Sequence, residues 1–261
     1  MGSATTQALA ASAQALAAAS GVSLDTAREL FAAARAVGES SQLSGALADP
    51  AATVAARQNV VSAVFGGFSA PTQSVLKTVV AERWSSADDL VDGIEELAIR
   101  ATAIAESGVD IEGELFGFSR VIAANSELEL ALGSRLGGSE AKIALVERLL
   151  SGAAASTRLI VSSLVGQPRE RRVRQLLNRA IRIVSSQHGR VVATVHSATE
   201  LSEAQRTRLS DALSRRYDGT VSLNVVIDPA VVGGLRVQIA DDVIDGSISA
   251  RLADLRQKLA G

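Results

Sequence analysis

The feature that most constrains this chain is an internal repeat in which segments recur 85 residues apart. Residues 29–47 are ELFAAARAVGESSQLSGAL, and residues 114–132 are ELFGFSRVIAANSELELAL. The alignment has no gap, and the same spacing continues through later pairs: Arg57 with Lys142, Val64 with Leu149, Phe65 with Leu150 and Thr72 with Thr157. A repeat of this period predicts two copies of one supersecondary unit.

Within each copy the apolar residues recur at helical spacing. Val60, Val61 and Val64 form one such set, and proline separates successive sets at Pro71 and Pro168. Hydrophobic residues make up 47% of the chain but aromatics only 3%, a composition that favours closely packed helices over aromatic-rich sheets. We therefore expect one helical bundle over residues 1–107, as a diverged extra copy, and a second over residues 108–189.

The spacing changes after Gly189. Apolar residues occupy alternate positions in residues 223–227 and 235–239, which is the period of a β-strand, and residues 190–195 form a third expected strand. Ser202 and Gln205 have capping-box spacing at the start of a helix that should run to about Tyr217. A final helix is expected over residues 248–259. The chain is thus expected to be mainly α, with two related helical bundles followed by a small α/β C-terminal module over residues 190–261.

The charge and cysteine content exclude several classes of function. Lys and Arg number 26 against 28 Asp and Glu, so there is no net field that would attract nucleic acid, and no nucleic-acid partner is expected. Without cysteine there is no disulfide, no thiolate nucleophile and no cysteine-based metal site. Polar residues interrupt the N-terminal alanines, and no segment reaches membrane-spanning length without polar residues, so neither a secretory signal nor a membrane span is expected.

Few side chains suggest chemistry. His188 and His196 are the only histidines, and neither lies near a cluster of other candidate ligands in the sequence. Glu95 and Glu96 are adjacent and do not form a facing acid-base pair. Trp84 follows a helix junction, where packing is the expected role. No catalytic residue, metal site or cofactor is expected.

Residues 169–182 contain six arginines. No aromatic residue is interleaved with them, and Arg171, Arg174 and Arg182 lie near one helical face. We interpret this stretch as a solvated or partner-facing helix, because a nucleic-acid site would normally add stacking platforms.

Residues 225–255, VVIDPAVVGGLRVQIADDVIDGSISARLADL, concentrate residues with special backbone roles. Pro229 cannot donate to a strand ladder, and Gly233 and Gly234 permit positive φ at a turn or bulge. Asp245 and Gly246 form a turn pair, and Ser247 or Asp245 can cap the final helix. Neither GxGxxG nor GxxxxGK[ST] is present, so a phosphate-binding loop is not indicated.

This segment resembles the C-terminal signature of the family of ATP synthase delta subunits and mitochondrial oligomycin-sensitivity-conferring proteins. The matching positions include Asp228, Pro229, Gly233, Gly234, Leu235, Asp245, Gly246 and Ser247. Residues 108–261 resemble most of an ordinary member, and residues 1–107 are an additional bundle. Long forms of this kind resemble those of actinobacteria.

The resemblance implies a non-catalytic stator subunit of an F-type ATP synthase, held at the cytoplasmic face of the cell membrane only through the complex. In this family the helical bundle receives the N-terminal helices of the alpha subunits, and the C-terminal module holds the C-terminal end of the b subunit. We expect helix-in-groove contacts at both places, and a structural or partner-facing role for the signature residues. The alternatives are a helical adaptor of another pathway and a small-ligand enzyme, and an enzyme would need convergent titratable groups.

Overall fold

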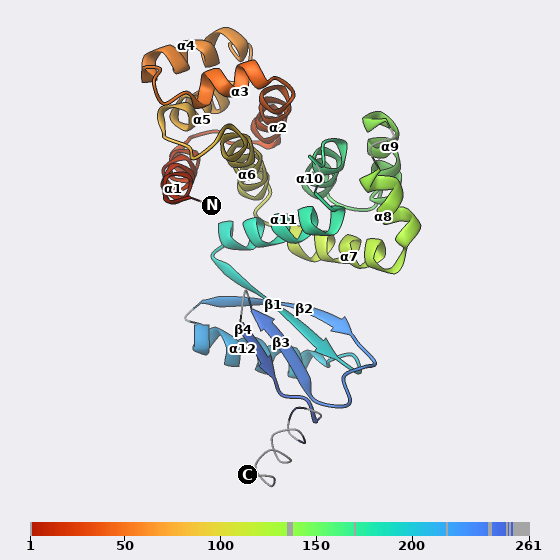
Figure 1. Ribbon diagram of the computed structural model, residues 1–261. Helices are drawn as coiled ribbons and strands as arrows, with labels where there is room; N and C mark the ends of the chain where they lie inside the picture. The colour runs from red at the N-terminus through yellow and green to blue at the C-terminus, as the bar shows by residue number, and fades with distance from the viewer. Residues whose placement is uncertain are drawn as a thin grey trace. The chain divides into compact units, whose positions relative to one another are not determined.

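The computed structural model describes residues 2–134, 138–169, 171–217, 219–239, 242–248, 250 and 252. The chain divides into two compact units, residues 1–184 and 185–261. The first unit is helical, and the second combines a four-stranded sheet with α12 (Figure 1). This confirms the expected fold class, whereas the boundaries expected after residues 107 and 189 stay predictions.

Helices dominate the described part of the chain. They are α1 (Ser3–Ala18), α2 (Leu24–Glu39), α3 (Ser41–Ala48), α4 (Val54–Val64), α5 (Ala70–Ala81), α6 (Ala87–Ala105), α7 (Ile111–Ala124), α8 (Ser126–Gly133), α9 (Ser139–Leu149), α10 (Ala155–Gly166), α11 (Val173–Gln187) and α12 (Glu203–Tyr217). The strands are β1 (Arg190–Ser197), β2 (Thr220–Ile227), β3 (Leu235–Ile239) and β4 (Asp242–Asp245). Side chains cap several helices, and Ser23, Ser86 and Asp110 each accept a hydrogen bond from a backbone amide in the first turn.

The helices repeat with the same spacing as the sequence. A shift of 85 residues carries α3, α4 and α5 onto the bounds of α8, α9 and α10, and α2 onto α7. The same shift carries α1 onto α6, while α6 itself corresponds to α11 after one inserted residue. Helix α6 is therefore both the last helix of the first copy and the first helix of the second.

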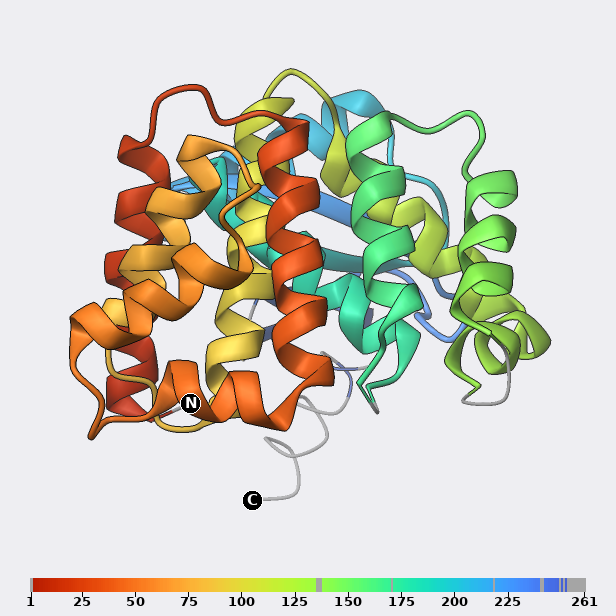
Figure 2. The ribbon, with the colours of Figure 1, turned by 90° about the horizontal axis from the view of Figure 1, so that it is seen from above.

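The burial of α6 fits this double role. Helix α1 has four buried residues, whereas α6 has twelve. Ala98, Ile99 and Ala103 of α6 are at most 1% exposed, although the corresponding residues of α1 are partly or fully exposed. Helix α6 packs on α1, α2, α3 and α5 of the first copy and on α10 of the second, and α2 also contacts α10 (Figure 2). The two copies therefore pack directly against each other.

The repeat extends to individual hydrogen bonds. Glu29 on α2 accepts bonds from the Ser69 amide at 3.0 Å and from the Thr72 hydroxyl at 2.5 Å, at the start of α5. The equivalent Glu114 on α7 accepts bonds from the Ala154 amide and the Thr157 hydroxyl, at the start of α10. In both copies a carboxylate from another helix satisfies free N–H groups at a helix N-terminus.

We expect Glu29→Gln to lower the free energy of unfolding by about 1 kcal/mol at pH 7. Burial raises the pKa of Glu29, but the hydrogen bonds from Ser69 and Thr72 outweigh it and hold the pKa below its ordinary value of 4.5. Because the folded pKa is the lower one, this stabilisation is present above the unfolded pKa and is lost as the pH falls through the folded value. Urea denaturation followed by the fluorescence of Trp84 at neutral and acidic pH measures it. Glu127→Gln, at an exposed glutamate, is the control, and an equal loss at both pH values would contradict the assignment.

The second unit is a mixed sheet with strand order β2-β1-β3-β4. Strand β1 is parallel to β2 and antiparallel to β3, which is antiparallel to β4. The core contains residues of β1, β2 and β3 and one residue of α12: Ala193, Val195, Leu213, Val221, Val237 and Ile239. The three expected strands and the helix to Tyr217 are confirmed, and Ser202 and Gln205 form the expected capping box.

Strand β4 was not expected. It contains only two apolar residues, and it is held by pairing with β3, from Arg236 opposite Asp245 to Ile239 opposite Asp242. Such a short strand has no alternating pattern of its own to predict it. The helix expected over residues 248–259 lies mostly outside the described residues.

Candidate functional site

An ion-pair network lies inside the first unit, between carboxylates of α6 and arginines in and before α11. The guanidinium of Arg171 binds Glu95 through two hydrogen bonds, 2.8 Å to Oε1 and 2.7 Å to Oε2. Arg179 lies 3.0 Å from the same carboxylate. Two further pairs extend the network: Arg100 with Glu96 at 2.8 Å and Arg169 with Asp92 at 2.9 Å. The network ties α6 to the last helix of the second copy.

These charges are largely shielded from solvent. The side chain of Glu95 is 9% exposed and that of Arg171 is 23% exposed. Burial lowers the pKa of Arg171, but the hydrogen bond and the charge of Glu95 outweigh it and raise the pKa above its ordinary value, so the guanidinium stays protonated. The expectation that Arg171 faces solvent or a partner was therefore wrong, because its partner lies 76 residues away on α6. Arg182 is exposed, as expected.

Trp84 and His196, two of the other side chains considered in the sequence, each contact residues of the same chain. Trp84 is 6% exposed and donates to the Val79 carbonyl at 2.8 Å, which confirms its expected packing role. Gly93 of α6 makes room for the indole, since a Cβ there would lie 2.2 Å from the ring. His196 on β1 has Nδ1 3.6 Å from a carboxylate oxygen of Asp228.

The first of the residues on which the family resemblance rests lie in the loop between β2 and β3. The Asp228 amide donates to the Ser197 carbonyl at 2.8 Å, and its carboxylate accepts from the Ala230 amide at 3.0 Å. Pro229 follows at an exposed position. Gly233 and Gly234 have φ values of +69° and +80°, which confirms the expected positive φ.

Residues 245–248, which carry the rest of the resemblance, are hydrogen-bonded to the end of this loop. The Gly246 amide donates to the Leu235 carbonyl at 2.8 Å, and the Ile248 amide donates to the Gly233 carbonyl at 3.1 Å. A Cβ on Gly234 would lie 2.5 Å from the Gly246 carbonyl oxygen, so glycine is what lets the two backbones approach. We call residues 228–235 with residues 245–248 the signature junction.

Asp245 and Ser247 fix the end of this junction. Hydrogen bonds from Ser247 to the Asp245 carboxylate lower the pKa of Asp245, and the backbone bond measures 2.9 Å. The Ser247 hydroxyl accepts from the Ala250 amide at 3.2 Å, as expected for a helix cap. Two large apolar side chains of the junction, Val232 and Ile248, and that of Leu252 after it in the chain are about half exposed or more.

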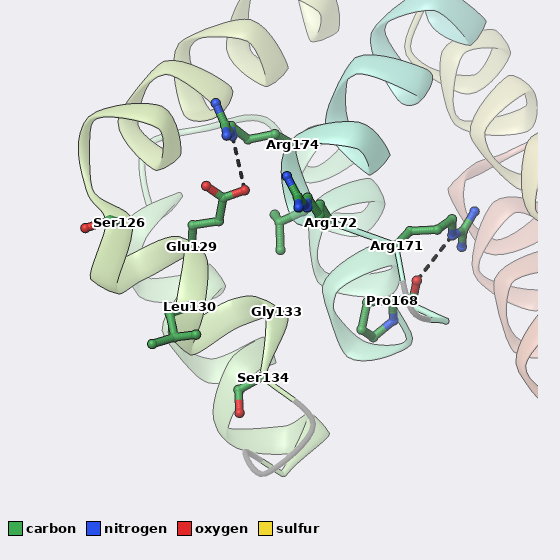
Figure 3. A pocket seen from close by; sticks show the side chains of 10 residues that line it. Ser126, Glu129, Leu130, Gly133, Ser134, Pro168, Arg171, Arg172 and Arg174 are labelled. Atoms are coloured by element: carbon green, nitrogen blue, oxygen red, sulfur yellow. Dashed lines mark hydrogen bonds and ion pairs between the residues drawn. The ribbon is translucent and has the colours of Figure 1, made fainter.

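A groove lies between α8 and the start of α11, with a volume of about 550 Å³ (Figure 3). Leu130 and Glu129 line it from α8, and Arg172 and Arg174 line it from the other side. Glu129 and Arg174 form an ion pair across it at 3.1 Å. The arginines are evident in the sequence but the groove is not, because only the tertiary fold brings α8 close to them. We call it the α8–α11 groove.

Two absences hold for the described residues alone. No three histidine, cysteine, aspartate or glutamate side chains among them gather closely enough to hold a metal ion. No helix that they form has the length and apolar character needed to cross a membrane.

Comparisons with known proteins agree in pointing to one family. The family model described as "ATP synthase delta (OSCP) subunit" matches twice, over residues 7–109 and 98–259. The two matches overlap within α6 and the turn after it, the helix that both copies share. A protein of Leifsonia xyli called "ATP synthase subunit delta" is 51% identical over the whole of both chains. Proteins with the same name from Streptomyces avermitilis and Thermobifida fusca are 38% and 36% identical, over 82% and 89% of this chain and 81% and 89% of theirs.

Proposed function

Since the chain belongs to the family of ATP synthase delta (OSCP) subunits, in a long form like that of its actinobacterial relatives, we propose that it is a non-catalytic stator subunit of an F-type ATP synthase. It would link the N-terminal helices of the alpha subunits to the C-terminal end of the b subunit, at the cytoplasmic face of the cell membrane. The observation that carries the proposal is the double family match, one for each copy and the second continuing through the α/β unit. A catalytic head makes ATP from rotation only when a stator of this kind resists the torque.

The first copy has an exposed helix face, on α1, that a helix of the alpha subunit could contact, whereas the equivalent face of the second copy is buried. Helix α1 leaves Gln7, Ala10, Gln14 and Ala17 exposed. Its counterpart α6 is buried between the two copies, so the same face of the second copy is already occupied. Small exposed side chains allow close approach of another helix. We therefore assign the contact with the alpha subunit to α1.

The second unit offers a different surface for the b subunit. In the signature junction Val232 is 64% exposed and Ile248 is 49% exposed, and Leu252, four residues further along the chain, is 50% exposed. Because the transfer of apolar groups of this size out of water lowers the free energy, a helix with an apolar stripe is a suitable partner. The junction would then hold these side chains in place without contacting b through its glycines.

Removal of the protein from membranes tests the proposed function. Stripped membranes should lose proton-driven ATP synthesis while the detached head still hydrolyses ATP, and adding the purified chain should restore coupling. Unchanged coupling after removal would refute the proposal and favour a helical adaptor of another pathway.

Single cysteines test the two contact assignments, because the chain has none of its own. With a photoactivatable thiol reagent in the reassembled complex, Ala17→Cys on α1 should cross-link to an alpha subunit, and Val232→Cys should cross-link to b. Ala144→Cys, exposed on α9, should cross-link to neither. Cross-links to alpha from residue 144 but not from residue 17 would assign the head contact to the second copy.

A further inference from the structure

The α8–α11 groove differs from its counterpart in the first copy. The corresponding corner, between the end of α3 and the start of α6, holds a cavity of about 630 Å³ whose lining includes Ala48, Ser86 and Ala87 and also Arg83 and Trp84. By the 85-residue spacing Leu130 corresponds to Gly45. Counted from the first residue of each helix, Arg172 and Arg174 correspond to Ser86 and Asp88. The positions that carry Leu130, Arg172 and Arg174 in the second copy thus carry glycine, serine and aspartate in the first.

The first copy shows that the bundle does not need these side chains. Leu130 is 74% exposed, the highest value among the exposed large hydrophobic residues described, and glycine suffices at the same place in the other copy. An apolar side chain that is neither buried nor required by the fold indicates a contact outside the chain. The groove beside it has a volume within the usual range of binding pockets.

The charges of the groove favour an acidic partner. Arg171 points away from Leu130 and is committed to Glu95, and Arg174 is paired with Glu129 (Figure 3). Arg172 forms no ion pair with any described residue, and its side chain is exposed. For a small anion, the groove therefore offers only the guanidinium of Arg172 without an ion-pair partner among the described residues. A helix could place an apolar side chain against Leu130 and carboxylates beside Arg172 and Arg174 at the same time.

We propose that the α8–α11 groove binds an acidic amphipathic helix of a partner protein, with Leu130 as the apolar contact and Arg172 as the main charge contact. This is a third docking surface, in addition to those of the proposed function, and its test does not depend on that function. The chain's own residues 251–258 do not complement the positive charge of the groove, because they contain three basic residues and one acidic residue.

A labelled peptide of about 15 residues tests the proposal, with leucines at i, i+3, i+4 and i+7 flanked by glutamates. Fluorescence anisotropy with the full chain should show binding of this peptide and at least about tenfold weaker binding of an analogue with glutamine in place of glutamate. Leu130→Ala with Arg172→Ser should weaken binding of the acidic peptide by at least about tenfold. These changes introduce small side chains, as in the first copy, so the thermal unfolding curve should match the wild type.

The matched control is Leu149→Ala with Arg182→Ser, an exposed leucine and an exposed arginine that do not line the groove. This variant should bind the peptide as the wild type does. Equal binding of the glutamine analogue, or no effect of the groove variant, would overturn the proposal. Displacement of the peptide by millimolar inorganic phosphate would indicate a small-anion site instead, and self-association that occupies the groove would indicate a second copy of the chain.

Discussion

Replacing Glu95 with alanine should lower the free energy of unfolding of the first unit by about 3 kcal/mol. The change removes the carboxylate that both Arg171 and Arg179 bind. Their side chains are 23% and 19% exposed, so water replaces the lost partner only in part. The network between α6 and α11 thus loses one negative charge, and Arg171 and Arg179 keep only their longer contacts with Asp92 and Glu96, at 3.5 to 3.9 Å.

Urea denaturation followed by tryptophan fluorescence measures this effect, because the single tryptophan, Trp84, lies in the first unit. Glu127→Ala, at an exposed glutamate of α8, is the control and should change the free energy by less than about 0.5 kcal/mol. Methionine at Glu95, Arg171 and Arg179 together should recover most of the loss, since apolar side chains of similar volume often replace a buried ion network without cost. A loss below about 1 kcal/mol for Glu95→Ala would show that the network is effectively solvated.

The network also bears on the proposed function. Helix α6 belongs to both copies, and the ion pairs hold the last helix of the second copy, α11, against it. A stator element that loosened at this point would rotate or stretch before it transmitted force. We therefore expect Glu95→Ala to reduce the restoration of ATP synthesis in stripped membranes, even at temperatures where the chain stays folded.

Much of the fold could be predicted because it depends on local patterns. The 85-residue repeat predicts the paired helices, and the alternation after Gly189 predicts three strands. The positive φ at Gly233 and Gly234 and the capping box at Ser202 follow from the conformational preferences of those residues alone. Such features need little information about distant parts of the chain.

The features that were missed depend on contacts between distant residues. The shared role of α6 was not visible because α1 and α6 have different solvent exposure and hence different side chains, such as Gln14 in α1 where α6 has Ile99. The pair of Arg171 with Glu95 spans 76 residues, and the charge stretch alone favours a solvated helix. The α8–α11 groove likewise exists only once tertiary packing brings α8 to α11.

Gly234→Val should unfold or severely destabilise the second unit, with an expected loss of about 3 kcal/mol or more. A β-branched residue strongly disfavours the φ of +80° found here. Its Cβ would also lie 2.5 Å from the Gly246 carbonyl oxygen and 2.9 Å from the Ser247 Cα, and both atoms are backbone. The loops must separate, which weakens the bonds of Gly246 to Leu235 and of Ile248 to Gly233. A unit of this size has a small core and only a few kcal/mol of stability.

The single tyrosine, Tyr217, lies in the second unit, so its fluorescence during urea denaturation reports on this unit while Trp84 reports on the first. Gly219→Val is the matched control, because that glycine is in the same unit and leaves room for a Cβ, whose nearest neighbours would lie 3.8 Å away. Only the Gly234 variant should lose the tyrosine transition and the cross-link to b from residue 232, while the tryptophan transition and the cross-link to alpha from residue 17 persist. If Gly234→Val unfolded like the control, the close crossing of the two loops would not be what holds the signature junction together.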